Sequence, residues 1–284
     1  MSHLHLALER FKKQQKEQPS RHGAGGAGQN SSLSITYTHT RSIDIPEMEL
    51  QERRVLSGFT SGPFVDAYKI LRTQVVHRLR ENHWNTLGIT SPGEGEGKTL
   101  TAVNLALSLA MEVTQTVLLV DANLRNPTIH QVFGLGDCAG LADYLLDDIP
   151  VADLLVNPGI DRFVLMPGGR AIPNSAEFLT SPKMVSLVDE FKNRYQSRII
   201  IFDLPPLLQS ADVLAFSPYT DAILLVVEEG KTTVDDVTRA MELTKKSTPI
   251  LGTVLNKGGR PGLPLASDRA ASPLSAASSA HHRR

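Results

Sequence analysis

The chain lacks most features that mark an extracellular or membrane-spanning protein. It has one cysteine among 284 residues, Cys138, so no disulfide can form within the chain, which fits a reducing compartment. Its longest apolar runs, such as AILLVV at 222–227, are far shorter than the roughly 18 residues of a membrane helix. The first 17 residues are polar and basic, unlike a secretory signal. We therefore expect a cytoplasmic location, with any membrane association made through a partner.

Charge of either sign is not in excess. The formal net charge is −1, and the middle of the chain has no basic stripe. Because proteins that bind nucleic acid need such a basic surface, we expect no nucleic-acid partner. A hydrophobic content of 41% and a charged content of 21% are typical of a globular protein.

Composition divides the chain into three regions. Residues 1–61 are rich in Gly, Ser and Asn in their middle part and are expected to be a flexible N-terminal region. Within it, the amphipathic pattern of residues 4–11 fits either a short docking helix or a solvated arm. Residues 258–284 contain mostly Gly, Pro, Ala and Ser and are expected to be a disordered tail. The folded domain is then 62–257.

The folded domain alternates short apolar runs with helical patterns. Continuous apolar runs such as TVLLVD are typical of strands buried on both faces of a sheet. Strands are expected at 86–90, 116–121, 162–169, 198–206, 221–229 and 250–258. Helices are expected at 98–112, 140–148, 181–195 and 232–247. This alternation predicts an α/β fold with a doubly wound, mostly parallel sheet and helices on both faces.

A glycine-rich loop, TSPGEGEGKTLT at 90–101, joins the first expected strand to the first helix. This is the context of a phosphate-binding loop, in which backbone N–H groups and the helix N-terminus hold the phosphates. In this interpretation Lys98 bridges the β- and γ-phosphates of a nucleotide, and the Thr99 hydroxyl binds Mg²⁺. The loop departs from the usual pattern in having Pro92 at the position of the first glycine.

Two acids in the loop, Glu94 and Glu96, would repel phosphate if they pointed into it. Because such a loop binds phosphate mainly through its backbone, we expect both side chains to face water. The predicted nucleotide-binding set is Gly93, Glu94, Gly95, Glu96, Gly97, Lys98, Thr99, Leu100 and Asn256.

The residues that follow the last expected strand bear on the choice of base. Guanine-binding proteins of this kind use an Asn-Lys-x-Asp sequence, whose acid accepts hydrogens of the guanine ring. Here Asn256 and Lys257 are followed by two glycines, so the guanine acceptor is missing. Asn256 then either binds an adenine amino group or only caps the strand end. We expect the nucleotide to be ATP.

Two acidic residues end apolar runs: Asp121 closes VLLVD and Asp203 closes IIIFD. The carboxyl ends of parallel strands meet at the edge of the sheet where the loop lies. A Mg²⁺ ion that bridges phosphate oxygens needs such acids, directly or through water. Each acid alone could be a turn or helix-cap residue. Taken together, Thr99, Asp121 and Asp203 form a predicted metal site, and Lys98, Asp121 and Asp203 are the predicted catalytic residues.

The segments AYKILRTQV, TSPGEGEGKT, VLLVDANLRNP, GLADYLL, PNSAEFLTS, IIIFDLPP and LLVVEEGKT occur in this order along the chain. In this combination they resemble the bacterial tyrosine kinases of capsule and exopolysaccharide synthesis, over about residues 62–257. The resemblance implies a P-loop ATPase fold related to ParA and MinD. It also implies transfer of the ATP γ-phosphate to tyrosine and a membrane partner that sets polysaccharide chain length.

The resemblance assigns roles to individual residues. It implies that Lys98 and Thr99 belong to the Walker A motif. Asp121 would be the first acid of the family's second Walker motif, close to Mg²⁺ and the incoming hydroxyl, and Asp203 would be the Walker B acid. Asn123 departs from the family, because it stands where a second acid is expected and brings no charge to the metal.

The resemblance also covers a short segment near the start of the folded domain. Asp66, Lys69 and Arg72 match an acid–x–x–base–x–x–Arg pattern that helps family members form ring-like homo-oligomers. Here Asp replaces the usual Glu and Lys replaces the usual Arg. A homo-oligomer is therefore expected, although through altered contacts.

The tyrosines differ from the family pattern. Family members usually end in a tyrosine cluster that is phosphorylated in trans. The five tyrosines of this chain are Tyr37, Tyr68, Tyr144, Tyr195 and Tyr219, so none lies in the expected tail. Tyr37, in the expected flexible region, is then the reachable acceptor within the chain.

Two functions remain open from the sequence. The first is a tyrosine kinase that acts on a partner or on Tyr37 in exopolysaccharide biosynthesis, export and chain-length control. The second is an ATPase switch or assembly module of the same pathway, which Asn123 and the tyrosine-free tail favour. A ParA- or MinD-type positioning ATPase is a third and weaker alternative, because those proteins carry a signature lysine where Gly93 stands here.

Overall fold

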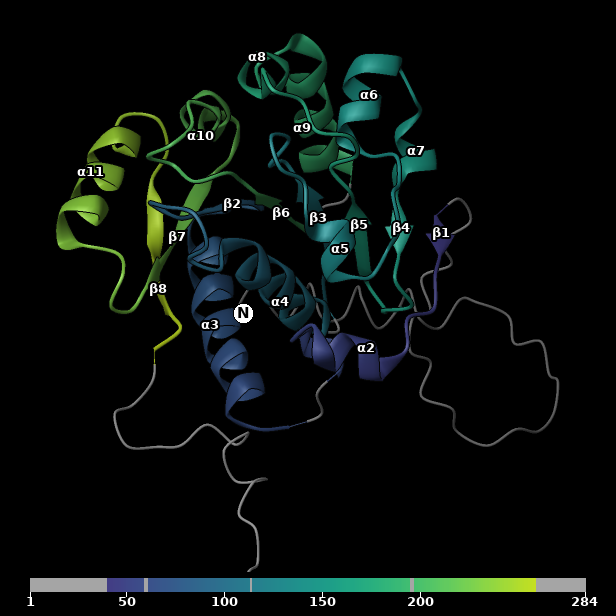
Figure 1. Ribbon diagram of the computed structural model, residues 1–284, viewed down its shortest axis with the longest axis horizontal. Helices are drawn as coiled ribbons and strands as arrows, with labels where there is room; N and C mark the ends of the chain where they lie inside the picture. Colours follow the sequence, from purple (N-terminus) through teal and green to yellow (C-terminus); the bar gives the residue numbers. More distant parts are fainter. Residues whose placement is uncertain (1–39, 59–60, 113, 195–196, 259–284) are drawn as a thin grey trace, which may run out of the picture. The chain divides into compact units, whose positions relative to one another are not determined.

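The computed structural model describes residues 40–58, 61–112, 114–194 and 197–258. Its strands are β1 (Arg41–Ser42), β2 (Thr86–Thr90), β3 (Thr116–Asp121), β4 (Val156–Asn157), β5 (Phe163–Met166), β6 (Arg198–Asp203), β7 (Ala222–Glu228) and β8 (Ile250–Asn256). In the described residues they form one eight-stranded sheet in the order β1-β4-β5-β3-β6-β2-β7-β8 (Figure 1). Neighbouring strands are parallel except β4 and β5, which are antiparallel.

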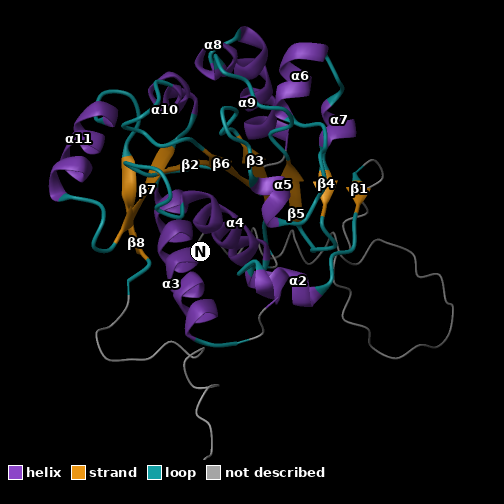
Figure 2. Ribbon diagram, viewed as in Figure 1, coloured by secondary structure: helices purple, strands orange, loops and turns teal. Residues whose placement is uncertain are grey.

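Helices cover both faces of this sheet (Figure 2). One face carries α2 (Glu47–Glu52), the 3₁₀ turn η1 (Leu56–Gly58), α3 (Pro63–Glu81), α4 (Lys98–Ala110) and α5 (Ile129–Val132). The other carries α6 (Leu141–Asp147), α7 (Val151–Leu154), α8 (Ser175–Leu179), α9 (Pro182–Arg194), α10 (Asp212–Phe216) and α11 (Val234–Thr244), with the 3₁₀ turn η2 (Ser217–Tyr219) after α10. The predicted doubly wound α/β architecture is confirmed.

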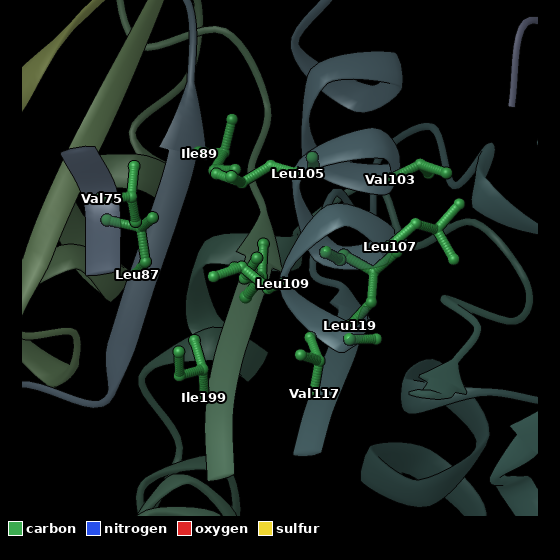
Figure 3. Packing of buried hydrophobic residues seen from close by; sticks show 14 of the residues in the cluster. Val75, Leu87, Ile89, Val103, Leu105, Leu107, Leu109, Val117, Leu119 and Ile199 are labelled. Atoms are coloured by element: carbon green, nitrogen blue, oxygen red, sulfur yellow. The ribbon is translucent and has the colours of Figure 1, made fainter. Parts of the chain in front are cut away.

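The central strands supply side chains to two separate cores. Val117 and Leu119 of β3 belong to the core on the α4 side, together with Leu107 (Figure 3). Leu118 and Val120 belong to the core on the opposite face. This alternation follows from the two-residue period of a strand. Burying each such side chain contributes about 1.5–3 kcal/mol, which explains why the strand is apolar throughout.

The register of the sheet brings three strand ends to one edge. Asp121 of β3 is opposite Asp203 of β6, and Asp203 is in turn opposite Ile89 of β2. The glycine-rich loop leaves β2 after Thr90, and α4 begins at Lys98. The loop and both acids are therefore placed at the carboxyl ends of adjacent parallel strands.

All six predicted strands occur in the structure, and two further short strands were not predicted. β1 and β4 have two residues each and pair with one another at one side of the sheet. A two-residue strand is too short to show a periodic pattern in the sequence. The antiparallel pairing of β4 with β5 was likewise not expected.

The ordered fold extends further toward the N-terminus than the region 62–257. Residues 40–58, which the sequence analysis assigns to the flexible region, contain α2 and η1. Leu50, Val55 and Leu56 are buried in the core on the α4 side. The Leu56 N–H also donates to the side chain of Asn104 in α4, at 2.7 Å. This segment needs only a few apolar residues to be held in the fold, because these residues are buried against α4.

Several predictions concern residues outside the described part of the chain. They are the amphipathic pattern of 4–11, the candidate acceptor Tyr37, and the tail from 259 onward. Tyr195 also lies outside it. Among the helices that are described, none is both long enough and apolar enough to cross a membrane.

Candidate active site

The glycine-rich loop turns tightly between β2 and α4. Gly95 and Gly97 have φ angles of +71° and +90°, in the left-handed region that favours glycine. Gly97 is the N-cap of α4, and no side chain of the described residues caps the helix there. The first N–H groups of this 13-residue helix therefore face a position that suits an anion such as phosphate.

Thr99 connects this loop to the end of β6. Its hydroxyl donates to Asp203 Oδ2 at 2.7 Å, and Lys98 Nζ lies 3.4 Å from Thr99 Oγ1. Asp203 is fully buried, and its Oδ1 has no hydrogen-bond partner among the described residues. An unsatisfied buried carboxylate oxygen is costly, so Oδ1 of Asp203 is suited to a metal ion or a metal-bound water.

Asp121 lies beside Asp203 and is also fully buried. Its Oδ1 accepts the N–H of Asn123 at 3.3 Å, and its Oδ2 accepts those of Thr128 and Ile129 at 2.9 and 3.0 Å. Asp121 thus holds the first turn of α5, which is the capping role that the sequence left open. Because a carboxylate has about four acceptor positions, one remains for a ligand.

The two carboxyls perturb each other. Burial raises the pKa of Asp121, the negative charge of Asp203 raises it further, and the three N–H bonds lower it only in part. Burial also raises the pKa of Asp203, against the opposing effects of Lys98 and the Thr99 hydroxyl. Two adjacent buried acids, of which only Asp203 is influenced by Lys98, favour the binding of a further positive charge.

These residues fit the predicted Mg²⁺ ion. Mg²⁺ prefers oxygen ligands, and the site offers the Thr99 hydroxyl, the unpaired Oδ1 of Asp203 and one open position on Asp121. No group of three or more His, Cys, Asp or Glu in the described ranges could hold a metal alone.

Glu96 does not face water, which corrects the expectation from the sequence. Only 2% of the residue is exposed. Its Oε2 accepts the N–H of Gly93 at 3.1 Å, and its Oε1 accepts the hydroxyl of Thr232 at 2.6 Å. The side chain folds back across its own loop because one oxygen finds a donor in the loop, at Gly93, and the other finds one after β7, at Thr232. Glu94 is exposed, as expected.

Asn256 contacts the loop. Its Nδ2 donates to the carbonyl of Glu96 at 2.9 Å, and its Oδ1 accepts the N–H of Lys257, also at 2.9 Å. A Cβ at Gly97 would lie 2.0 Å from this Nδ2, so the glycine permits the close approach. Both ends of the amide are used within the protein, and a contact with adenine stays a prediction.

Two lysines at the loop were not predicted. Lys231 Nζ donates to the carbonyl of Glu94 at 2.5 Å, and Lys257 Nζ donates to that of Gly95 at 2.7 Å. Glu228 lies 3.5 Å from the first ammonium and 3.0 Å from the second. Lys257 lies at the end of one expected strand and Lys231 lies two residues after another. This position was the available signal, because it places both lysines at the same edge of the sheet as the loop.

The predicted oligomerisation residues lie on α3. Asp66 and Lys69 are exposed and form an ion pair of 3.2 Å. Arg72 Nη1 donates to the carbonyl of Ser108 at 3.0 Å, and its Nε lies 3.4 Å from Glu112 Oε1. Arg72 therefore ties α3 to the C-terminal end of α4 within the chain. A role of these residues between chains stays a prediction.

A cavity of about 630 Å³ lies near Asp121. Pro127, His130 and Arg170 are among its lining residues. Gly168 stands between this wall and the acid: a Cβ there would be 2.6 Å from Pro127 Cβ and 3.2 Å from Asp121 Cγ. The absence of a side chain at Gly168 thus allows the cavity wall to approach the carboxyl.

The sheet order, the loop and the paired acids define an α/β protein of the P-loop ATPase class. No family model matches the chain. Among solved structures, the septum site-determining protein MinD of Pyrococcus horikoshii, complexed with Mg-ADP, has a TM-score of 0.50 and 23% identity. The match covers 63% of this chain and 72% of that chain. This likeness shows the fold.

Closer relatives identify the family. Tyrosine-protein kinase YwqD of Bacillus subtilis is 33% identical over 192 residues, which are 67% of this chain and 80% of that protein. The chimerical protein CapA2B2 has a TM-score of 0.66 and 26% identity over 78% of this chain and 94% of that chain. The chain therefore belongs to the bacterial tyrosine kinase family, and the resemblance inferred from its motifs is confirmed.

Proposed function

We propose that this chain is an ATP-dependent protein-tyrosine kinase that acts in exopolysaccharide biosynthesis, export and chain-length control. The observation that carries the proposal is the placement of Asp121 and Asp203 side by side, with Thr99 bonded to Asp203 and Lys98 next to it. Phosphoryl transfer requires phosphate binding, charge neutralisation and an acceptor for the hydroxyl proton. The family membership supports the same activity.

Each of these residues has a defined task in the proposed mechanism. The loop N–H groups and Lys98 hold the phosphates of ATP. Thr99 and Asp203 would hold Mg²⁺, and the bound ion would neutralise negative charge on the phosphates of ATP. Asp121 accepts the proton of the incoming tyrosine hydroxyl. Burial, reinforced by Asp203, raises its pKa and so makes it a stronger base than an exposed carboxylate.

The acceptor tyrosine is proposed to reach Asp121 from the neighbouring cavity. Tyr68, Tyr144 and Tyr219 are each partly buried in the fold. Burial also raises the pKa of the Tyr68 hydroxyl. A tyrosine that must enter another site needs to be exposed, so these positions are poor acceptors. We infer that the acceptor belongs to a partner protein or is Tyr37.

The proposed partner is a membrane protein that determines polysaccharide chain length, which would contact the chain through a cytosolic segment. This contact would keep a cytoplasmic kinase at the membrane. The solved relative CapA2B2, which is a chimera, is similar to this chain over most of its length and motivates the search for such a partner. Homo-oligomer formation through the exposed Asp66 and Lys69 on α3 is part of the same proposal.

A second function is an ATPase switch or assembly module of the same pathway. It is favoured by Asn123, which is buried two residues after Asp121 and supplies no charge where the family has a second acid. In this alternative, water takes the γ-phosphate, and ATP hydrolysis changes the oligomeric state.

Labelled ATP distinguishes the two functions. The purified chain is incubated with γ-labelled ATP and Mg²⁺, with and without the cytosolic segment of the membrane partner. The kinase proposal expects phosphotyrosine that is lost in Lys98→Met and strongly reduced in Asp121→Asn. Asp189→Asn, an exposed acid on α9, is the matched control and should behave as the unaltered chain. Phosphate release without phosphotyrosine on any protein contradicts the kinase and supports the switch.

A further inference from the structure

The phosphate loop is held from outside by three side chains. Its consecutive carbonyls each accept one hydrogen bond from a side-chain nitrogen. The pairs are Glu94 with Lys231 Nζ at 2.5 Å, Gly95 with Lys257 Nζ at 2.7 Å, and Glu96 with Asn256 Nδ2 at 2.9 Å. Lys231 lies in the turn after β7, and Asn256 and Lys257 lie at the end of β8. The ends of these two neighbouring strands therefore hold three successive peptide groups of the loop.

Holding these carbonyls also orients the N–H groups that follow them. A trans peptide is planar, so its C=O and the next N–H point in opposite directions. The described residues contain no cis peptide. The N–H groups of Gly95, Glu96 and Gly97 therefore point away from the side-chain nitrogens that hold the preceding carbonyls. Convergent N–H groups of this kind form an anion-binding concavity.

A second set of contacts acts through the Glu96 side chain. Its Oε2 accepts the Gly93 N–H, and its Oε1 accepts the Thr232 hydroxyl. The Thr232 oxygen accepts in turn the N–H of Glu228, at 2.8 Å. A continuous series of hydrogen bonds thus runs from the end of β7 to the first glycine of the loop. Nearly complete burial of Glu96 strengthens these bonds and makes the loss of any one costly.

We propose that Glu96, Lys231, Thr232, Asn256 and Lys257 form a loop brace, a set of positioning residues that hold the phosphate loop in its binding conformation before nucleotide arrives. None of them needs to touch the reacting atoms. Their effect is on nucleotide affinity, because a loop already ordered loses less conformational entropy on binding. The inference rests on the proposed function, since it assumes that this loop binds the phosphates of ATP.

Thr232 provides the sharpest test, because its hydroxyl can be removed without a change of charge. Thr232→Val leaves Glu96 Oε1 without its partner, whereas Thr232→Ser keeps a hydroxyl. We expect Thr232→Val to weaken MgADP binding about tenfold, which is the usual effect of leaving a buried acceptor unpaired. Thr232→Ser should bind MgADP within about twofold of the unaltered chain. Calorimetric titration of the full chain measures both affinities.

Matched controls separate positioning from general stability. Thr238→Val removes an exposed hydroxyl on α11 that only contacts the carbonyl of Val234, and it should leave affinity unchanged. The melting temperature of the nucleotide-free Thr232 variants is measured alongside. If Thr232→Val binds MgADP like the unaltered chain, or lowers only the melting temperature, the brace is overturned. Equal losses in Thr232→Val and Thr232→Ser would also contradict it.

A second variant covers the case in which Thr232→Val does not fold. Lys257→Met removes the exposed ammonium that contacts both the Gly95 carbonyl and Glu228, and Lys246→Met is its control on an exposed lysine outside the loop. Only the first should weaken MgADP binding. A failure of the unaltered chain to bind MgADP would overturn the proposed function together with the brace, whereas normal binding with unaffected variants would overturn the brace alone.

Discussion

Asp121 and Asp203 are register partners at the carboxyl ends of β3 and β6, and neither carboxyl is exposed to solvent. Two buried acids at adjacent positions disfavour each other's ionised form. The nucleotide-free chain therefore carries an electrostatic cost at the place where a divalent cation is proposed to bind. Removing one of the two charges should therefore raise the free energy of unfolding and lower the affinity for the metal-bound nucleotide.

Asp203→Asn should show these opposite responses. The substitution removes one of the two buried charges, so we expect the nucleotide-free chain to gain about 1 kcal/mol of unfolding free energy. MgATP affinity should fall at least tenfold, because a proposed metal ligand loses its charge. Urea unfolding and calorimetric titration measure the two effects. Asp189→Asn is the control, and a loss of both stability and affinity would argue for a purely structural role of Asp203.

Thr99→Ala should change the dependence of nucleotide binding on Mg²⁺. The hydroxyl bonded to Asp203 is the proposed link between the loop and the ion. We expect ATP affinity in the presence of Mg²⁺ to fall about tenfold. With EDTA present, the variant and the unaltered chain should bind ATP equally. Equal losses in both conditions would show that Thr99 supports the loop without taking part in metal binding.

Gly97→Ala should disrupt the loop. Gly97 has a φ of +90°, and an added Cβ would be 2.0 Å from Asn256 Nδ2. We expect a loss of about 1–2 kcal/mol in stability and a much weaker affinity for MgADP. Gly252→Ala is the matched control, because a Cβ in that strand position meets no atom within 4 Å. Thermal unfolding measures the stability of both variants, and titration measures their affinity for MgADP. If Gly97→Ala and Gly252→Ala have similar stability and affinity, the expected disruption of the loop is contradicted.

Arg72→Ala should lower the stability of the single chain. Arg72 contacts the Ser108 carbonyl and Glu112 across the α3–α4 interface. We expect a loss of about 1 kcal/mol in unfolding free energy. Lys69→Ala removes only an exposed ion pair with Asp66 and should cost much less. Sedimentation of both variants measures their self-association. We expect Lys69→Ala to reduce association with little effect on stability, whereas Arg72→Ala should mainly reduce the stability of the single chain.

The stability of the chain should fall in acid partly through Asp221. Burial raises the pKa of this carboxyl, but hydrogen bonds from Lys192, the N–H groups of Asn85 and Thr86 and the Thr86 hydroxyl outweigh it and leave the pKa lowered. A lowered folded-state pKa contributes stability above the ordinary carboxyl pKa of about 4, and this contribution is lost as pH falls through the folded-state value. Urea unfolding should therefore show a deficit for Asp221→Asn at pH 6 that shrinks near pH 3. A deficit independent of pH would contradict this account.

Local pattern was sufficient for much of the fold. The strand at 116–121 could be predicted because a strand buried on both faces must be apolar throughout, and the loop because its glycines precede Lys98 and Thr99. The two-residue strands β1 and β4 could not, since they exist only through pairing with each other and with β5. The packing of residues 40–58 likewise depends on the surface that α4 presents to them.

By itself, the sequence determined the strands longer than two residues, the phosphate loop and the two acids that end their strands, because each follows from residues that are close together in the chain. Only the tertiary structure decided how the loop is held. The Glu96 side chain points inward because its carboxylate accepts the hydroxyl of Thr232, 136 residues away, and the Glu96 backbone carbonyl is held by the side chain of Asn256, 160 residues away. Such partners are brought together by the parallel sheet, and no local pattern of hydrophobicity or spacing records their contact.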